Sequence, residues 1–152
     1  MSVRVLLAVL LAGALVAASL PAIEAAQRTH AETDLDTSVR TVETAVERLR
    51  THSDPVPCGV PGARQRVQIE IPERGPNARL RVVPDGPHTR LHVTVDESPS
   101  SVTVLNATVR PLAEARTVAW NDTLTVREST EIWLRYRQVE GRPVVTVARG
   151  FK

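Results

Sequence analysis

The sequence predicts an α+β protein in which an N-terminal apolar helix continues into an amphipathic helix, and that helix packs on an antiparallel β-sheet of about seven strands. Three features of the sequence predict this fold: an apolar run at the start, then apolar residues at helical spacing, and a period of two from residue 65 onward. We expect residues 24–152 to form one domain, because a chain of this length can enclose a single hydrophobic core.

Residues 1–23 form the predicted membrane segment. The apolar run extends from Val5 to Leu20 and resumes after Pro21 as far as Ile23. It is longer than the 7–15 residues or so of a cleavable signal, and it reaches the roughly 17–25 residues that a membrane-spanning helix needs. Leu20-Pro21-Ala22 fits a cleavage site poorly, because Leu is bulky where a small residue is preferred. We therefore favour an uncleaved signal-anchor, and a cleaved signal peptide is the alternative.

The charges that flank this segment predict its orientation. Arg4 precedes the apolar run without any acid, whereas the other flank carries Glu24, Glu32, Asp34 and Asp36. Positive flanks stay on the cytoplasmic side of a membrane. We expect a single-pass protein of the cell membrane whose C-terminal domain is extracytoplasmic, or a secreted protein if the N-terminus is cleaved.

The amphipathic helix is predicted over residues 24–52, with Pro21 as a kink or a first-turn residue. Its apolar residues recur at intervals of 4, 3, 4 and 3 and so form one stripe, which consists of Leu35, Val39, Val42, Val46 and Leu49. We expect this stripe to pack on the sheet of the same chain, so that Val42 and Val46 are buried. A coiled-coil seam for another subunit is the alternative use of the stripe.

A loop rich in Pro and Gly over residues 53–64 separates the helix from the β region of residues 65–152. The alternation of apolar and polar residues predicts strands around Val67–Ile71, Leu80–Val82 and Leu91–Val95, the last two joined by the turn Pro84-Asp85-Gly86-Pro87. After a loop over 96–101, further strands are predicted over Val102–Val109, Arg116–Trp120, Thr123–Arg127, Ile132–Tyr136 and Val144–Val147, with a turn at Glu140-Gly141 before the last.

The residues that carry chemistry are sparse, and we predict a non-enzymatic protein with no catalytic residues, no metal site and no cofactor. His88 and His92 have a spacing that suits zinc only on a helix, and here they are predicted in a turn and a strand. Cys58 is the single cysteine and cannot form an internal disulfide. The net charge of +2 is too small to indicate binding to nucleic acid.

Two surface features remain. Asn106 and Asn121 each begin an Asn-x-Thr sequence, which is a candidate glycosylation site in an exported domain. Arginines alternate with apolar residues on predicted strands, and the possible binding face that they form consists of Arg79, Arg81, Arg135 and Arg137. The alternative is a solvated face covered by long polar side chains.

An apolar helix interrupted by Pro21, an amphipathic helix after it and then an antiparallel sheet resemble the layout of type IV pilins and pseudopilins. The Arg-rich, Lys-poor and Val-rich composition also resembles that of small haloarchaeal proteins associated with pili and secretion. This resemblance implies a membrane-tethered accessory or structural protein of a surface filament or secretion apparatus, with other envelope or secretion proteins as partners. An accessory protein fits better than a filament subunit, because Val5–Leu20 has no acid and Met1–Arg4 is too short for a processing site. A secreted soluble binding module that uses the arginine face is the alternative function.

Overall fold

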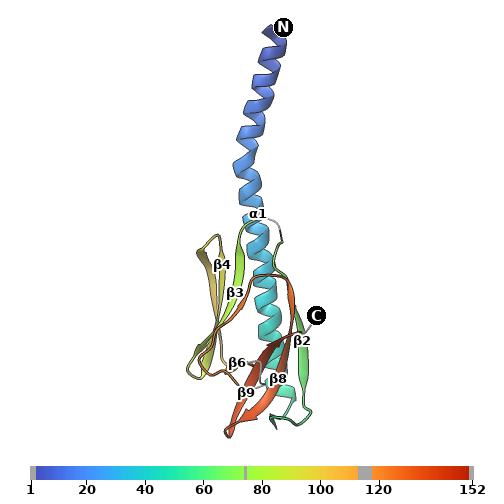
Figure 1. Ribbon diagram of the computed structural model, residues 1–152, viewed down its shortest axis with the longest axis vertical. Coiled ribbons are helices and arrows are strands. Elements are labelled where there is room, and N and C mark those ends of the chain that lie inside the picture. The colour runs from blue at the N-terminus through green and yellow to red at the C-terminus, as the bar shows by residue number, and fades with distance from the viewer. Residues whose placement is uncertain (1–2, 74, 113–117, 151–152) are drawn as a thin grey trace.

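The computed structural model describes residues 3–73, 75–112 and 118–150 (Figure 1). It contains one long helix, α1 (Val3–His52), and nine strands arranged in two sheets. The predicted α+β class is confirmed.

Helix α1 is a single element of 50 residues that includes Pro21 in its interior. Burial begins at Ala31, and the predicted stripe of Leu35, Val39, Val42, Val46 and Leu49 lies in the core. Val42 and Val46 are only 3% and 2% exposed, which confirms their predicted burial. The alternative of a free coiled-coil seam is therefore wrong, because the chain's own strands cover the stripe.

The strands fall into two sets. The first sheet contains β1 (Val56–Pro57), β2 (Arg64–Ile69), β6 (Val109–Pro111), β8 (Thr130–Val139) and β9 (Arg142–Arg149). Its order is β1-β8-β9-β6, and β2 also pairs with β8. The second sheet contains β3 (Ala78–Asp85), β4 (His88–Val95), β5 (Ser98–Leu105) and β7 (Leu124–Val126), in the order β5-β4-β3-β7. We call these the five-stranded sheet and the four-stranded sheet.

The prediction of one antiparallel sheet was wrong in two respects. The strand predicted over Val102–Val109 is broken at residues 106–108, where the chain leaves β5 in one sheet and enters β6 in the other. In addition, β1 and β6 pair in parallel with β8 and β9. Alternation in the sequence reports which face of a strand is buried, but it does not report which strand is its neighbour.

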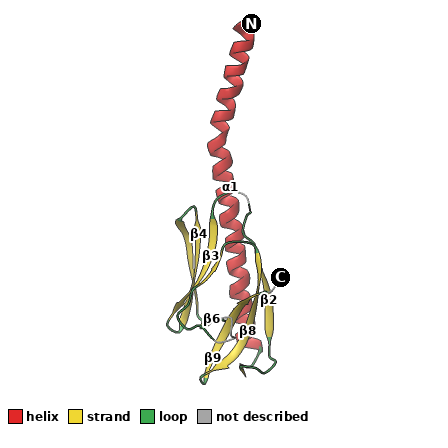
Figure 2. Ribbon diagram, viewed as in Figure 1, coloured by secondary structure: helices red, strands yellow, loops and turns green. Residues whose placement is uncertain are grey.

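The C-terminal half of α1 contacts β2 and β8 of the five-stranded sheet and β4 and β5 of the four-stranded sheet. Figure 2 shows the helix running between the two groups of strands, with its N-terminal half projecting beyond them. One stripe of α1 thus packs against both sheets, and the shared core consists almost entirely of Val, Leu, Ile and Ala. The β-branched Val and Ile among them fit pleated sheet faces well.

Two predicted hairpins are confirmed: β3–β4 turns at Gly86, and β8–β9 turns at Glu140-Gly141. The predicted loop over 96–101 is wrong, because Val95 pairs directly with Ser98 and only Asp96 and Glu97 form the turn. Both turn residues have positive φ, at 50° and 64°, as a type I′ hairpin requires. The strand predicted over Arg116–Trp120 lies partly outside the described residues, and Val118 forms an isolated bridge with Leu112.

Candidate functional site

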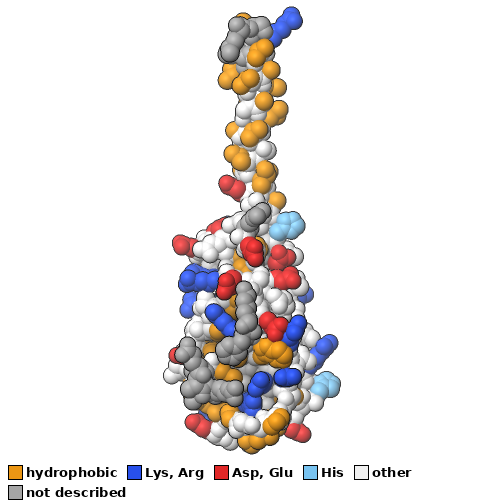
Figure 3. Space-filling model, turned by 45° about the vertical axis from the view of Figure 1, so that its right-hand side comes forward, with side chains coloured by type: hydrophobic (Ala, Val, Ile, Leu, Met, Phe, Trp, Pro, Cys, Tyr) orange, Lys and Arg blue, Asp and Glu red, His pale blue; other side chains and the backbone are white. Residues whose placement is uncertain are grey.

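The N-terminal half of α1 is the most distinctive surface of the molecule. It is long and apolar enough to cross a membrane, and none of its membrane-length apolar window is buried. The large side chains exposed along it are Val3, Val5, Leu7, Val9, Leu10, Leu11, Leu15, Val16, Leu20 and Ile23. Figure 3 shows hydrophobic side chains along the visible side of a narrow stalk. A helix that is apolar all round is stable only in protein or in lipid, so this half is compatible with a membrane anchor and also with a signal sequence.

A short polar neck joins this apolar half to the sheet domain. The first acid is Glu24 and the first buried residue is Ala31, so the neck comprises residues 24–30, or about 10 Å of helix. An ion pair of 3.2 Å between Arg28 and Glu32 spans one turn across the end of the neck. Since the helix is continuous, the neck fixes the direction of the domain relative to the apolar segment.

The structure does not bring the four arginines of the predicted binding face together. Arg79 and Arg81 lie on β3 of the four-stranded sheet, whereas Arg135 and Arg137 lie on β8 of the five-stranded sheet. This corrects the sequence interpretation, which assumed a single sheet. Arg137 also has a structural role, because its Nη1 donates hydrogen bonds to the carbonyl oxygens of Pro57 and Val60 at 3.1 and 2.7 Å.

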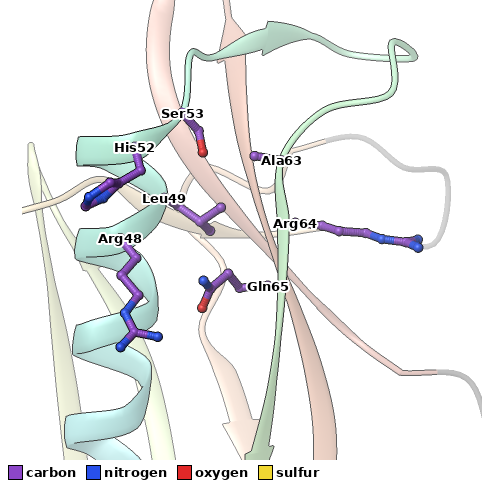
Figure 4. A pocket seen from close by; sticks show the side chains of 7 residues that line it. All are labelled: Arg48, Leu49, His52, Ser53, Ala63, Arg64 and Gln65. Atoms are coloured by element: carbon purple, nitrogen blue, oxygen red, sulfur yellow. The ribbon is translucent and has the colours of Figure 1, made fainter.

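The outer face of the five-stranded sheet gathers other arginines that the sequence analysis missed. On β2, Arg64 lies opposite Arg135 of β8, and Arg66 lies opposite Trp133. Figure 4 shows Arg64 pointing away from α1, toward the outer side of β2. Its guanidinium carbon lies 5.1 Å from the centre of the Trp133 ring. Alternation in β2 places its arginines on the polar face, but only the strand register places them beside β8.

One comparison with known proteins found a match, and it extends over nearly the whole chain. The model of a family described as "Domain of unknown function (DUF7311)" matches residues 2–150. The chain belongs to the DUF7311 family. No curated protein and no solved structure matches the chain. The DUF7311 match includes both the apolar half of α1 and the sheet domain, so the two belong to one family unit.

Two shallow hollows of the DUF7311 chain lie between α1 and β2. One, of about 340 Å³, is lined by Arg48, Leu49, His52, Ser53, Ala63, Arg64 and Gln65 (Figure 4). The other, of about 440 Å³, lies beside Thr41, Thr44 and Arg66. Both are open to solvent, and no carboxylate lines either of them. They lack the enclosed apolar walls and convergent polar groups that are typical of a small-molecule site.

The candidate metal residues of the sequence are apart in the fold. His88 and His92 both lie on β4, where a separation of four residues spans about 13 Å. Cys58 is exposed in the loop after β1. Across residues 3–73, 75–112 and 118–150, no three His, Cys, Asp or Glu side chains form a group that could hold a metal ion.

Among the described residues, Arg110 is the charged residue that is buried, at 4% exposure. Its Nη1 donates to the carbonyl oxygen of Val109 at 2.8 Å, and its Nη2 donates to that of Gly86 at 2.5 Å. Its guanidinium carbon lies 6.0 Å from the centre of the Trp120 ring. Burial lowers the pKa of Arg110 from its ordinary value. These contacts tie β6 of one sheet to the β3–β4 turn of the other, which is a structural role.

Both candidate glycosylation residues are exposed. Asn106 lies at the crossing between β5 and β6, and Asn121 lies in a bend before β7. Their threonines differ, because the Thr108 hydroxyl donates a hydrogen bond to the carbonyl oxygen of Pro87 at 2.9 Å. Both asparagines are thus accessible to solvent. In the first Asn-x-Thr sequence, however, the Thr108 hydroxyl is already hydrogen-bonded to Pro87.

Proposed function

We propose that this DUF7311 protein is a membrane-tethered extracytoplasmic protein that acts as an accessory or structural part of a surface filament or secretion apparatus. The observation that carries the proposal is the continuity of α1, whose exposed apolar half and buried half form one helix. A rigid helix of this kind transmits the position of the membrane segment directly to the sheet domain. A flexible linker would instead let the domain move freely.

The charges around the apolar half support the proposed orientation. Among the described residues, the charged residue on the N-terminal side of the apolar half is Arg4. On its C-terminal side, the first charged residue is the acid Glu24. The domain is then held close to the extracytoplasmic face of the membrane, because the neck is only about 10 Å long. The layout of stalk and sheet domain also supports the likeness to pilins and pseudopilins that the sequence suggested.

Determination of the mature N-terminus tests the tether. We expect the purified protein to retain the apolar residues, to sediment with membranes through an alkaline carbonate wash, and to be digested by protease added outside intact cells. A variant with Leu10→Arg and Leu15→Arg should leave the membrane fraction, because two arginines at mid-span are costly in lipid. A matched control, Thr37→Arg and Thr44→Arg, places the same charges on exposed positions of the domain and should stay membrane-bound. A mature N-terminus at Ile23 or Ala26 would contradict the tether.

The role in a filament or secretion apparatus needs a separate test. We expect the protein, crosslinked in intact cells, to be recovered with components of a surface filament or secretion machine. The Leu10→Arg and Leu15→Arg variant should lose these partners along with its membrane association. Recovery of the crosslinked protein without any such component would contradict this part of the proposal.

A soluble binding module is the second candidate, and the arginines on the outer face of the five-stranded sheet favour it. Arg64, Arg66 and Arg135 lie on neighbouring strands there. If the mature protein is found free in the medium, this candidate replaces the first.

A further inference from the structure

We propose that β5 pairs with β5 of a second copy of this chain, so that the four-stranded sheets of two molecules join into one continuous sheet. The two strands run antiparallel, and Thr103 of one copy lies opposite Thr103 of the other. This inference goes beyond the proposed function and does not depend on the membrane tether. It follows from strand order, exposure and charge.

Strand β5 has a long, uncharged free edge. It ends the order β5-β4-β3-β7, so among the described residues its outer side has no strand partner. None of its eight residues is charged, and six of them are exposed. The unpaired N–H and C=O groups of such a strand are a template for another chain, which edge charges and prolines usually prevent. Pro99 lies near the start of β5, outside the residues 101–105 that the proposed pairing uses.

The other sheet edges are less suited to pairing. Strands β1, β6 and β7 are only two or three residues long. In β7, the carbonyl oxygen of Thr125 already accepts a hydrogen bond from Arg149. Strand β2 carries Arg64 and Arg66, and charged side chains on an edge strand oppose its pairing with another strand. The edge that remains for a partner is therefore β5.

Exposed apolar side chains of the sheet domain also gather on β5. Among the described residues of this domain, the large apolar side chains that are exposed belong to Val102, Val104 and Val60. Val102 and Val104 are two residues apart on β5, so they lie on the same face of the sheet. A partner that covers them needs a free strand with apolar side chains at alternate positions.

A second copy of β5 supplies such a strand in one register. When Thr103 faces its own counterpart, Val102 of each copy lies opposite Val104 of the other, so all four valines are paired. A centre at Val102 would leave Val104 opposite Ser100, and a centre at Val104 would leave Val102 opposite Asn106. Pairs of β-branched residues and of threonines stabilise antiparallel strands. The side-chain pattern thus selects the centre at Thr103.

The charges at the two ends of β5 favour the antiparallel direction. Asp96 and Glu97 form an exposed turn directly before β5. Arg50 contacts the carbonyl oxygen of Asn106 directly after it. Parallel pairing of two copies would place their acidic turns side by side. Antiparallel pairing brings each acidic turn to the end of the partner where Arg50 lies, so the charges are complementary.

This pairing also determines how the two copies are oriented. Figure 1 shows β3 and β4 running alongside the C-terminal half of α1, and β5 pairs antiparallel with β4. The two-fold axis of an antiparallel self-pair is perpendicular to its strands, so the apolar halves of α1 point in roughly opposite directions. Tethered copies therefore pair between two facing membranes and not within one membrane.

Cysteine crosslinking of the full-length protein in nonionic detergent micelles tests the register. Cys58 is exposed and is first replaced by Ser. We expect Thr103→Cys to form a disulfide-linked dimer under mild oxidation, because the two Cβ atoms at the axis are about 4.5–5.5 Å apart. Ser98→Cys is the control on the same strand and should give less than about a tenth of that dimer, because its two copies are about 33 Å apart.

Two crosslinking results would overturn the proposal. Equal dimer from Ser98→Cys and Thr103→Cys would mean a parallel or random contact. No dimer from Thr103→Cys would mean that β5 does not pair with itself, and that any occupant of this edge is a different chain.

Lysines on the edge test the role of the valines. The double variant Val102→Lys and Val104→Lys changes two exposed positions and should weaken dimerisation at least about tenfold, because edge lysines oppose strand pairing. Val60→Lys is the matched control, since Val60 is also exposed but lies outside β5, and it should change the dissociation constant less than about twofold. Sedimentation in micelles measures all three proteins, and circular dichroism confirms that the variants are folded.

The sedimentation data can also contradict the pairing. Dimerisation of the double variant at wild-type strength would remove β5 as the interface. Equal losses in the double variant and in Val60→Lys would mean general apolar association. A wild-type protein that stays monomeric up to about 0.1 mM would likewise overturn the proposal.

Vesicles that carry the protein with its domain outside test the orientation, and this arm alone rests on the proposed tether. We expect vesicles with the wild-type protein or Val60→Lys to cluster, as measured by light scattering, and vesicles with the double lysine variant to stay dispersed. Dispersed wild-type vesicles with crosslinking retained would contradict pairing across facing membranes or the tether itself. Loss of both clustering and crosslinking would contradict the β5 contact.

Discussion

The Nη1 atom of Arg50 donates a hydrogen bond to the carbonyl oxygen of Asn106 at 2.5 Å. Arg50 belongs to the last turn of α1, and Asn106 lies where the chain passes from β5 of the four-stranded sheet to β6 of the five-stranded sheet. A carbonyl at such a crossing has no strand partner and needs another donor. The contact therefore joins the end of the helix to the connection between the two sheets.

Replacement of Arg50 by Gln should lower the free energy of unfolding by about 1 kcal/mol, because the bond is charge-assisted but exposed to water. Arg50 also pairs with Glu47 at 3.5 Å, and Glu47→Gln measures that part of the loss. Arg48→Gln removes the same charge as Arg50→Gln from the same region of the helix, and Arg48 forms no ion pair among the described residues. Urea unfolding of the three variants in micelles measures the differences. Equal stability of Arg50→Gln and Arg48→Gln would mean that the Asn106 contact contributes nothing.

The burial of Val42 can be tested with a carboxylate. Val42→Asp places an unpaired charge between α1 and the strands, at a position only 3% exposed, and should cost about 3 kcal/mol or more. Thr44→Asp introduces the same side chain two residues away at an exposed position and should cost less than about 1 kcal/mol. Thermal denaturation followed by circular dichroism compares them. An unchanged melting temperature for Val42→Asp would mean that α1 does not pack on the sheets.

Arg110 should be a large contributor to the stability of the domain. Arg110→Ala leaves the carbonyl oxygen of Gly86 without its donor and opens a space beneath Trp120, so we expect a loss of about 3 kcal/mol. Arg110→Lys keeps the charge but cannot reproduce the planar set of donors, and its loss should be similar or slightly smaller. The control is Arg142→Ala at an exposed position at the start of β9, which should be nearly neutral. Chemical unfolding gives all three values, and a neutral Arg110→Ala would contradict the structural role.

The two Asn-x-Thr sequences should differ in occupancy. The Thr108 hydroxyl is engaged with Pro87, so a folded domain presents the first sequence less well than the second. We expect a protein exported by a glycosylating cell to carry more glycan at Asn121 than at Asn106. Mass spectrometry of the intact protein and of the Asn106→Gln and Asn121→Gln variants measures this. Full occupancy at Asn106 with none at Asn121 would reverse the prediction.

Prediction from the sequence succeeded where the local burial pattern or the turn residues decide the structure. The 4-3-4-3 spacing identified the helix face that the sheets cover, and Asp85-Gly86 and Glu140-Gly141 identified two hairpin turns. It failed at residues 106–108, where no Pro or Gly marks the break between β5 and β6. The expected arginine face failed for the same reason, since the division into two sheets separates Arg79 and Arg81 from Arg135 and Arg137.

The sequence by itself determined the apolar N-terminal segment, the helix that continues from it, its buried stripe and the approximate positions of most β-strands. These features depend on residues close together in the chain, whose spacing follows directly from the 3.6-residue helix and the two-residue strand. Only the tertiary structure decided that the strands form two sheets around α1 and that Arg64 of β2 meets Arg135 of β8. Strand order and register depend on contacts between segments far apart in the chain, because every strand with one apolar face satisfies the same local pattern.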